Sequence, residues 1–281
     1  MMEMCIKTLL PDIQTWLEED DITKNFNYIR MLPKHPVRMQ LKIKNPLLLA
    51  GIDYFVATFA YLGTHCDFSF LTQYEGAKLD ECVIDFPENI PFNVAILSER
   101  LALNLLQHAS SIATWTHRHV EIASKRGIKI LDTRKTTPGL RSLEKYAVRI
   151  GGGFNHRFGQ TETWMIKDNH KSSLGGLEGA WNFFKNQGAF YNNTVVEIHS
   201  LEELKEAINL GCINVMLDNF NPEKIREAVE LKKTGMTYEV SGGLNLSNIT
   251  DYLIEGVDAL SLGSLTYSAP RVDMSLKFKS V

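Results

Sequence analysis

The sequence contains no long apolar run and only a few scattered cysteines, and these absences narrow the classes of protein it can encode. Its longest apolar stretch, NPLLLAGIDYFVATFAYLG, is broken by Gly51 and Asp53, so we expect no membrane span. The N-terminus has neither the basic start nor the small-residue cleavage site of a secretory signal. Four cysteines lie far apart along the chain: Cys5, Cys66, Cys82 and Cys212. Their spacing fits neither a disulfide framework nor a zinc site, so we expect reduced thiols in a cytoplasmic protein.

Motifs for covalent catalysis and for nucleic-acid binding are also absent. The chain has no GxSxG motif and no Cys/His pair of recognised form, which argues against a serine or cysteine nucleophile. Its basic residues are not interleaved with a stripe of aromatic side chains, which argues against a nucleic-acid partner.

The charge of the chain is unevenly distributed. With 281 residues, 44% of them hydrophobic, the chain is long enough for one α/β barrel or two modest domains. The formal net charge of −3 conceals a basic middle, because residues 117–171 hold 12 Lys and Arg against 5 Asp and Glu. This local excess of positive charge predicts an anionic ligand.

The first hundred residues predict a separate α+β layer. A helical pattern covers residues 6–20, an alternating strand pattern covers 37–45, and 51–63 have the spacing of a buried helix. A long helical stretch follows from residue 98 to 126, with Ser98 as its expected N-cap and an interruption expected near Ser110 and Ser111.

From residue 128 onward, short apolar runs alternate with helical patterns. The runs are IKILD, WMIKD, TVVEI, INVMLD, MTYEVSGG and DALSLGS. The helical patterns between several of them are LEELKEAINLG, PEKIREAVELKKTG and LSNITDYLIEGV. Such alternation is typical of parallel strands with helical crossovers, and it predicts an incomplete (β/α) barrel of the TIM type. The loops at the carboxyl ends of barrel strands form the working face.

The last two strand ends are rich in glycine and serine. Ser241, Gly242 and Gly243 follow one run, and Gly263 and Ser264 follow the next. Exposed backbone N–H groups at such junctions can bind a phosphate monoester. The alternative is that these glycines only make tight strand-to-helix turns.

Two carboxylates, Glu197 and Asp218, end neighbouring runs and should lie on the same face of the barrel. They could accept hydrogen bonds from sugar hydroxyls or hold Mg²⁺ through water. Alternatively, each acid could pair with a strand-end lysine such as Lys167. The residues alone do not separate these two interpretations.

A group of cations ends the early strands. Its members are Arg134, Lys135, His156, Arg157 and Lys167. We expect this cationic group to lack acidic partners until an anion arrives, because clustered positive charges repel one another. Arginine can grip a planar carboxylate through two parallel hydrogen bonds, so a carboxylate substrate is indicated.

Several of these stretches, taken together, resemble one enzyme family. The matching segments are SERLALNLLQHASSIAT, ILDTRKTTPGLRSLEKYAVRIGGGFNHRFG, IKDNH, VEIHSLEEL, INVMLDNF, EVSGGLNLSNI and LSLGSLTYSAPRVDMSLKF, in this order over residues 98–278. They resemble the quinolinate phosphoribosyltransferase family, also called nicotinate-nucleotide pyrophosphorylase (carboxylating). One departure lies in EEDDIT, where Asp20 stands at the position of a glycine in the family.

The resemblance implies a two-domain chain that forms a homodimer or an assembly of dimers with shared active sites. The N-terminal sandwich-like α+β domain would comprise residues 1–110, joined by residues 270–281, and the barrel would comprise 111–269. Arg100 matches an arginine that reaches the site of the neighbouring subunit.

The resemblance also implies a reaction and a set of site residues. Quinolinate and phosphoribosyl pyrophosphate, with Mg²⁺, would give nicotinate mononucleotide, pyrophosphate and CO₂ in de novo NAD biosynthesis. The matching quinolinate ligands are Arg100, Arg134, His156, Arg157 and Lys167. The matching phosphoribosyl pyrophosphate ligands are Lys135, Glu197, Asp218, Ser241, Gly242, Gly243, Gly263 and Ser264. Lys135, Glu197 and Asp218 would be catalytic, and Glu197 and Asp218 are the candidates for holding Mg²⁺ beside the pyrophosphate.

Two other functions remain open at this point. One is the related phosphoribosyltransferase-like branch associated with molybdenum-transport operons. The other is a barrel that binds a phosphorylated metabolite without turning it over.

Overall fold

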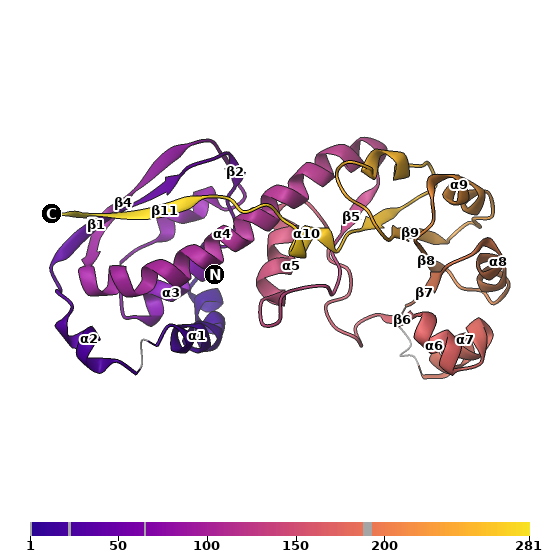
Figure 1. Cartoon of the computed structure of the whole chain (residues 1–281), viewed down its shortest axis with the longest axis horizontal. Helices are drawn as coiled ribbons and strands as arrows, with labels where there is room; N and C mark the ends of the chain where they lie inside the picture. The colour runs from indigo at the N-terminus through magenta and orange to yellow at the C-terminus, as the bar shows by residue number, and fades with distance from the viewer. Residues whose placement is uncertain (1, 22–23, 65, 188–192) are drawn as a thin grey trace. The chain divides into compact units, whose positions relative to one another are not determined.

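The computed structural model describes residues 2–21, 24–64, 66–187 and 193–281, and these form two compact units. The first unit comprises Met1–Trp115, Ser142–Gly151 and Ala269–Val281. The second comprises Thr116–Arg141 and Gly152–Ser268. The domain boundaries expected from the sequence differ from these mainly at residues 142–151, which cluster with the first unit. The long helix α4 (Phe92–Ala123) contributes residues to both units (Figure 1).

The first unit is built on a three-stranded antiparallel sheet in the order β11-β1-β4 (Figure 1). Its strands are β1 (Pro36–Ile43), β4 (Cys82–Pro91) and β11 (Met274–Ser280). Buried and more exposed residues alternate along β1, as the sequence predicted, because one face of the sheet packs on the core. β11 pairs with β1 from Val37 opposite Ser280 to Ile43 opposite Met274, so the last strand of the chain belongs to this sheet.

Helices and short segments complete the first unit. The bounds are α1 (Met2–Glu19), α2 (Phe26–Met31), β2 (Leu47–Leu48), α3 (Ile52–Tyr61), the 3₁₀ helix η1 (Ser69–Tyr74) and β3 (Lys78–Leu79). α1 and α3 confirm the two helical patterns predicted for this region. α3 is buried over most of its length, and its backbone N–H groups at Gly51 and Ile52 donate to the carboxylate of Glu75. Asp20 lies in a turn directly after α1, and residues 22 and 23 are outside the described residues.

The helix predicted from Ser98 differs from the observed one at its start and in its middle. α4 begins at Phe92, directly after β4, and Ser98 is fully buried within it, so the N-cap prediction was wrong. The predicted interruption at Ser110 and Ser111 is also absent. Both serines are buried in the helix, where the Ser111 hydroxyl donates to the Gln107 carbonyl 2.6 Å away. The Ser110 hydroxyl oxygen accepts from the backbone N–H of Ala50 at 3.0 Å. This serine therefore connects α4 to the segment before α3 and does not cap or interrupt the helix.

The second unit contains a six-stranded parallel sheet in the order β5-β10-β9-β8-β7-β6. The strands are β5 (Lys129–Leu131), β6 (Trp164–Ile166), β7 (Thr194–Ile198), β8 (Asn214–Asp218), β9 (Thr237–Ser241) and β10 (Ala259–Ser261). All six runs predicted as strands are confirmed. From β6 to β10, strands that follow one another in sequence are neighbours. β5 pairs with β10 and lies at the opposite edge from β6, as in a barrel that stays open between β5 and β6. The incomplete barrel is therefore confirmed.

Helices follow most strands, and α7, α8 and α9 lie along the outer side of the sheet (Figure 1). The elements are η2 (Ser124–Arg126), α5 (Arg141–Ile150), α6 (Asp168–Ser173), α7 (Gly176–Gln187), α8 (Leu201–Asn209), α9 (Pro222–Glu230), η3 (Ile249–Tyr252) and α10 (Ser264–Tyr267). The helix predicted over residues 246–257 is only the 3₁₀ turn η3. Here the side chain of Asn248 donates to the Gly243 carbonyl and accepts from the Asn245 N–H, which competes with regular helix formation.

No helix within the described residues is both long and apolar enough to cross a membrane. Cys66, Cys82 and Cys212 are free thiols, in agreement with the sequence prediction, while the side chain of Cys5 is outside the described part of the chain. Cys212 is buried, and this burial raises the pKa of its thiol to about 12. The thiol of Cys212 therefore stays protonated and packs as a small apolar side chain.

Candidate functional site

The register of the parallel sheet puts the polar strand-end side chains on one face. Glu197 is opposite Met216, two residues before Asp218, and Asp218 is opposite Ser241. Side chains two residues apart on a strand point to the same face, so Glu197, Asp218 and Ser241 share one face. Ile166 is paired with Val196, which brings Lys167 beside Glu197.

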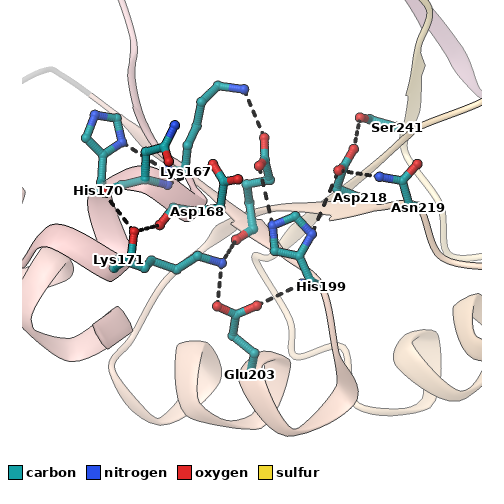
Figure 2. Close-up of polar contacts among 12 residues, drawn as sticks. Lys167, Asp168, His170, Lys171, His199, Glu203, Asp218, Asn219 and Ser241 are labelled. Carbon is teal, nitrogen blue, oxygen red and sulfur yellow. Dashed lines mark hydrogen bonds and ion pairs between the residues drawn. The ribbon is translucent and has the colours of Figure 1, made fainter. Parts of the chain in front are cut away.

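Two carboxylates and one imidazole form a compact group at this edge, the carboxylate–histidine cluster of Glu197, His199 and Asp218. The His199 Nε2 atom lies 3.4 Å from Glu197 Oε1, and its Nδ1 atom lies 3.8 Å from Asp218 Oδ2. One candidate ligand atom from each residue lies within 4.8 Å of the other two. Figure 2 shows the His199 ring directed toward Asp218.

Both carboxylates have additional partners that hold them in place. The Lys167 ammonium lies 3.0 Å from Glu197 Oε2. The Ser241 hydroxyl donates to Asp218 Oδ1 at 2.5 Å, and the Asn219 side-chain N–H donates to Asp218 Oδ2 at 2.7 Å (Figure 2). Pairing of a strand-end acid with Lys167 was one of the two interpretations that the sequence left open. The structure contains this pairing for Glu197.

A buried ion pair holds the backbone on which Glu197 and His199 are carried. Lys171 on α6 donates to the main-chain carbonyl of Glu197 at 2.9 Å and to the carboxylate of Glu203 on α8. The same carboxylate accepts from the backbone N–H of His199 at 2.8 Å (Figure 2). The side chains of Lys171 and Glu203 are only 10% and 20% exposed. The end of β7 is therefore held by two charged side chains, Lys171 on the Glu197 carbonyl and Glu203 on the His199 N–H.

The loop after residue 151 is anchored to the end of β5 by a fully buried acid, Asp132. Its Oδ1 atom accepts from the backbone N–H of His156 at 2.9 Å, and its Oδ2 atom accepts from the Asn155 side chain at 2.5 Å. Phe154 forms a parallel bridge with Leu131. These contacts hold the segment that carries His156 and Arg157 against the open edge of the barrel.

Arg134 and Arg157 place two guanidinium groups within electrostatic reach of each other. Partial burial lowers the pKa of Arg157, and the positive charge of Arg134 lowers it further. Arg157 Nη1 donates to the carbonyls of Gln160 and Thr163, at 3.2 and 3.0 Å. The Nε atom of Arg134 is buried and has no hydrogen-bond partner among the described residues. An anion bound here would relieve the repulsion between the two guanidinium groups.

The cationic group was expected to lack acidic partners, and for two members this expectation was wrong. Lys167 pairs with Glu197, and His156 Nε2 lies 3.3 Å from Glu239 Oε2. The other ring nitrogen of His156 accepts from the backbone N–H of Arg157 at 2.6 Å. Glu239 lies two residues before Ser241 on β9, so it points to the same face as Ser241.

Two of the late glycines, Gly242 and Gly263, lie where a side chain would clash with a neighbouring residue. A Cβ atom on Gly242, whose φ is +101°, would lie 2.2 Å from the side-chain oxygen of Asn219. A Cβ atom on Gly263 would lie 2.9 Å from the Cδ atom of Lys135. Thr266 donates its hydroxyl to the Lys135 carbonyl at 2.7 Å, so the turn at Gly263 and the Lys135 segment are packed together. Gly243 is exposed and has nothing near its would-be Cβ.

The remaining expected site residues have simple placements. Ser264 begins α10 and its hydroxyl donates weakly, at 3.4 Å, to the Leu244 carbonyl. Lys135 is exposed apart from its packing against Gly263. Arg100 is exposed on α4, in the first unit, whereas the other expected quinolinate ligands are in the second.

Sequence reasoning missed His199, Glu239 and the Lys171–Glu203 pair. His199 follows Glu197 by two residues and Glu239 precedes Ser241 by two, so strand alternation would have placed both on the working face. Lys171 and Glu203 are 32 residues apart, on two different helices, and no local pattern connects them.

Comparison with known proteins gives consistent matches along the chain. Residues 112–277 match the family model described as quinolinate phosphoribosyl transferase, C-terminal domain. A probable nicotinate-nucleotide pyrophosphorylase [carboxylating] of Bacillus subtilis is 45% identical over 65% of this chain and 63% of that protein, which is just under two thirds of its length. The nicotinate-nucleotide pyrophosphorylase [carboxylating] of Rattus norvegicus is 37% identical over 94% of this chain and 88% of the rat protein.

Solved structures match the whole chain. The crystal structure of NadC from Streptococcus pyogenes has a TM-score of 0.88 and 33% sequence identity, and it covers 98% of this chain and 97% of the other. Both units and their connection in sequence are thus shared with that protein.

Proposed function

The chain belongs to the quinolinate phosphoribosyltransferase family, and we propose that it converts quinolinate and phosphoribosyl pyrophosphate into nicotinate mononucleotide, pyrophosphate and CO₂. It is a carboxylating nicotinate-nucleotide pyrophosphorylase, a pentosyltransferase of NAD biosynthesis. The observation that carries the proposal is the division of one barrel face into two zones. The guanidinium groups of Arg134 and Arg157 repel each other in one zone, and Glu197 and Asp218 share the other.

The cationic zone suits the two adjacent carboxylates of quinolinate. Arg134 and Arg157 can each form paired hydrogen bonds to a carboxylate, and Lys167 can add a point charge. A substrate with one carboxylate would leave a half-buried positive group in this zone without its anionic partner, which weakens binding. This difference favours quinolinate over nicotinate.

His156 would serve this zone mainly through the loop. Its Nδ1 atom accepts from the Arg157 N–H, and its Nε2 atom faces Glu239, so in this arrangement the ring positions Arg157. Arg100, exposed on α4, would join the quinolinate ligands of a neighbouring subunit in a homodimer. The proposal also includes a cytoplasmic location.

The carboxylate zone suits the ribose and its leaving group. The pyridine nitrogen would attack C1 of the ribose and displace pyrophosphate, through a transition state with positive charge on the ring. Glu197 and Asp218 would favour that charge by their position, and Ser241 and Asn219 keep Asp218 oriented. Lys135 would bind the departing pyrophosphate. The turns at Gly242, Gly243, Gly263 and Ser264 leave backbone N–H groups accessible to the 5′-phosphate.

Mg²⁺ fits the residues of the carboxylate zone. Two carboxylates within reach of one another are the oxygen ligands that Mg²⁺ uses, and Glu197 and Asp218 would hold the ion directly or through water. When bound, Mg²⁺ would offset negative charge on pyrophosphate.

The second half of the reaction needs little from the protein. Once the ring nitrogen carries the ribose it is cationic, so the adjacent carboxylate can leave as CO₂. The ylide that remains is stabilised by the positive nitrogen and takes up a proton to give nicotinate mononucleotide. The enzyme has to hold the intermediate by its remaining carboxylate, which the cationic zone can do.

Turnover by the purified protein tests the proposal. The protein is mixed with quinolinate, phosphoribosyl pyrophosphate and Mg²⁺, and nicotinate mononucleotide and CO₂ are measured, with nicotinate as a parallel substrate. Equal amounts of both products from quinolinate, and none from nicotinate, are expected. A folded protein that binds phosphoribosyl pyrophosphate but forms no product would instead be a metabolite-binding barrel.

A further inference from the structure

The carboxylate–histidine cluster differs in one respect from a site built for Mg²⁺ alone, because it includes a nitrogen donor. His199 lies between the two acids, 3.4 Å from Glu197 Oε1 through one ring nitrogen and 3.8 Å from Asp218 Oδ2 through the other. Mg²⁺ prefers oxygen ligands and keeps several waters. Imidazole is a good ligand for first-row transition metals, and Mn²⁺ accepts both carboxylate and imidazole.

The surroundings of His199 keep it at this position. Its backbone N–H donates to Glu203 Oε2 at 2.8 Å, and the preceding strand end is held by Lys171 on the Glu197 carbonyl (Figure 2). The ring itself is 39% exposed, so an ion arriving from solvent can reach it.

The neighbouring polar groups leave suitable oxygen atoms available for an ion. Lys167 contacts Oε2 of Glu197, which leaves Oε1 on the side of His199. Ser241 donates to Oδ1 of Asp218. Oδ2 faces His199 and also accepts from the Asn219 side chain at 2.7 Å, so an ion would use the second lone pair of this oxygen. Two carboxylates and one ammonium carry a net charge of −1, which favours a divalent cation.

We propose that His199 is a metal ligand, and that the mixed donor set of Glu197, His199 and Asp218 binds Mn²⁺ more tightly than Mg²⁺. This inference rests on the proposed function, since it assigns the ion to the carboxylate zone. The rival role of His199 is that of a cation, in its protonated form, that bridges the two acids. The two roles predict opposite changes in Mn²⁺ affinity when His199 is replaced. Removing a ligand weakens Mn²⁺ binding, whereas removing a competing cation strengthens it.

Electron paramagnetic resonance of Mn²⁺ distinguishes these roles without any turnover. Mn²⁺ is titrated into wild-type protein and into His199→Asn and His199→Ala at pH 8, with and without phosphoribosyl pyrophosphate, and Mg²⁺ is added as a competitor. Bound Mn²⁺ in the wild type is then examined for electron–nuclear coupling to ¹⁴N. His117→Asn is the matched control, because His117 contacts a single carboxylate, Glu121, 3.0 Å away.

We expect Mn²⁺ to show nitrogen coupling in the wild type and in His117→Asn, and to show none in the two His199 variants. Loss of His199 should weaken Mn²⁺ binding about ten-fold or more, a loss typical of disturbing a metal's surroundings. The affinity for Mg²⁺ should change far less. No nitrogen coupling in the wild type, or tighter Mn²⁺ binding in the variants, would overturn the proposal.

Failure of the proposed function would be visible separately. If the wild type gives nitrogen-coupled Mn²⁺ but no nicotinate mononucleotide with either metal, the metal assignment stands and the enzymatic proposal fails. If product forms and the nitrogen coupling is missing, the enzymatic proposal stands and the metal assignment fails.

Discussion

Replacing Lys171 by methionine removes a buried ammonium group and keeps most of the side-chain volume. In the native protein this ammonium donates to the Glu197 carbonyl at 2.9 Å and to the Glu203 carboxylate. After the change, Glu203 retains its bond from the His199 N–H, but its charge loses its cationic partner. The Glu197 carbonyl loses one donor. The end of β7 would then be held from one side only.

The expected loss of stability follows from the exposure of the pair. Breaking a fully buried ion pair by removing one partner costs about 3–5 kcal/mol. Because the Glu203 side chain keeps 20% of its surface in water, we expect Lys171→Met to lower the free energy of unfolding by about 2–3 kcal/mol. In Lys171→Met/Glu203→Gln the uncompensated charge is gone, and the two changes should show a coupling of about 1–2 kcal/mol.

Urea denaturation measures the free energy, and hydrogen exchange assigns the loss to this segment. The amide of His199 should exchange faster in Lys171→Met. The control is Lys205→Met, which changes an exposed lysine on α8, the helix that carries Glu203. A loss of less than about 0.5 kcal/mol in Lys171→Met, the range of ordinary surface changes, would refute the reasoning. Strict additivity in the double variant would refute it as well.

Two further changes test the loops around the site. In Asp132→Asn, an amide NH₂ group would face the N–H donors of His156 and Asn155, and one of the two hydrogen bonds that hold the loop would be lost. The affinity for quinolinate should therefore fall about ten-fold, while the affinity for phosphoribosyl pyrophosphate is kept. An unchanged quinolinate affinity in calorimetry would contradict this prediction. Gly242→Ala places a Cβ atom 2.2 Å from the side-chain oxygen of Asn219, at a residue whose φ is positive. The KM for phosphoribosyl pyrophosphate should therefore rise, with little change in the KM for quinolinate. Equal KM values for wild type and Gly242→Ala in steady-state assays would show that this turn can adapt.

The strands of the barrel could be predicted from the sequence because their pattern is local. Each run of apolar residues is short and bounded by turns or charges, and the consecutive strands from β6 to β10 are neighbours. The carboxyl ends of parallel strands meet at one edge, so Glu197, Asp218 and Ser241 could be placed together without coordinates. Helix starts were less predictable, since Ser98 has the residue type of a cap but is buried inside α4.

The partners of the site residues could not be predicted, because they depend on register and on contacts between distant segments. Lys167 reaches Glu197 across 30 residues. His156 meets Glu239 only because β9 returns to the middle of the sheet and the loop after residue 151 lies at its open edge. Such pairings decide which charges in the site are compensated, and composition alone suggested that the cations were not.

The division of the barrel face into two zones is tested most directly by measuring two dissociation constants in three proteins. Calorimetry gives the affinities of the wild type, Arg157→Ala and Glu197→Gln for quinolinate and for phosphoribosyl pyrophosphate with Mg²⁺, and a steady-state assay gives the turnover of the same three proteins. Arg157→Ala should weaken quinolinate binding by about ten-fold or more, the effect of about 1.4 kcal/mol, and leave phosphoribosyl pyrophosphate binding nearly unchanged. Glu197→Gln should keep quinolinate binding and lower turnover. Equal losses for both ligands in Arg157→Ala, or unchanged turnover in Glu197→Gln, would contradict the two zones.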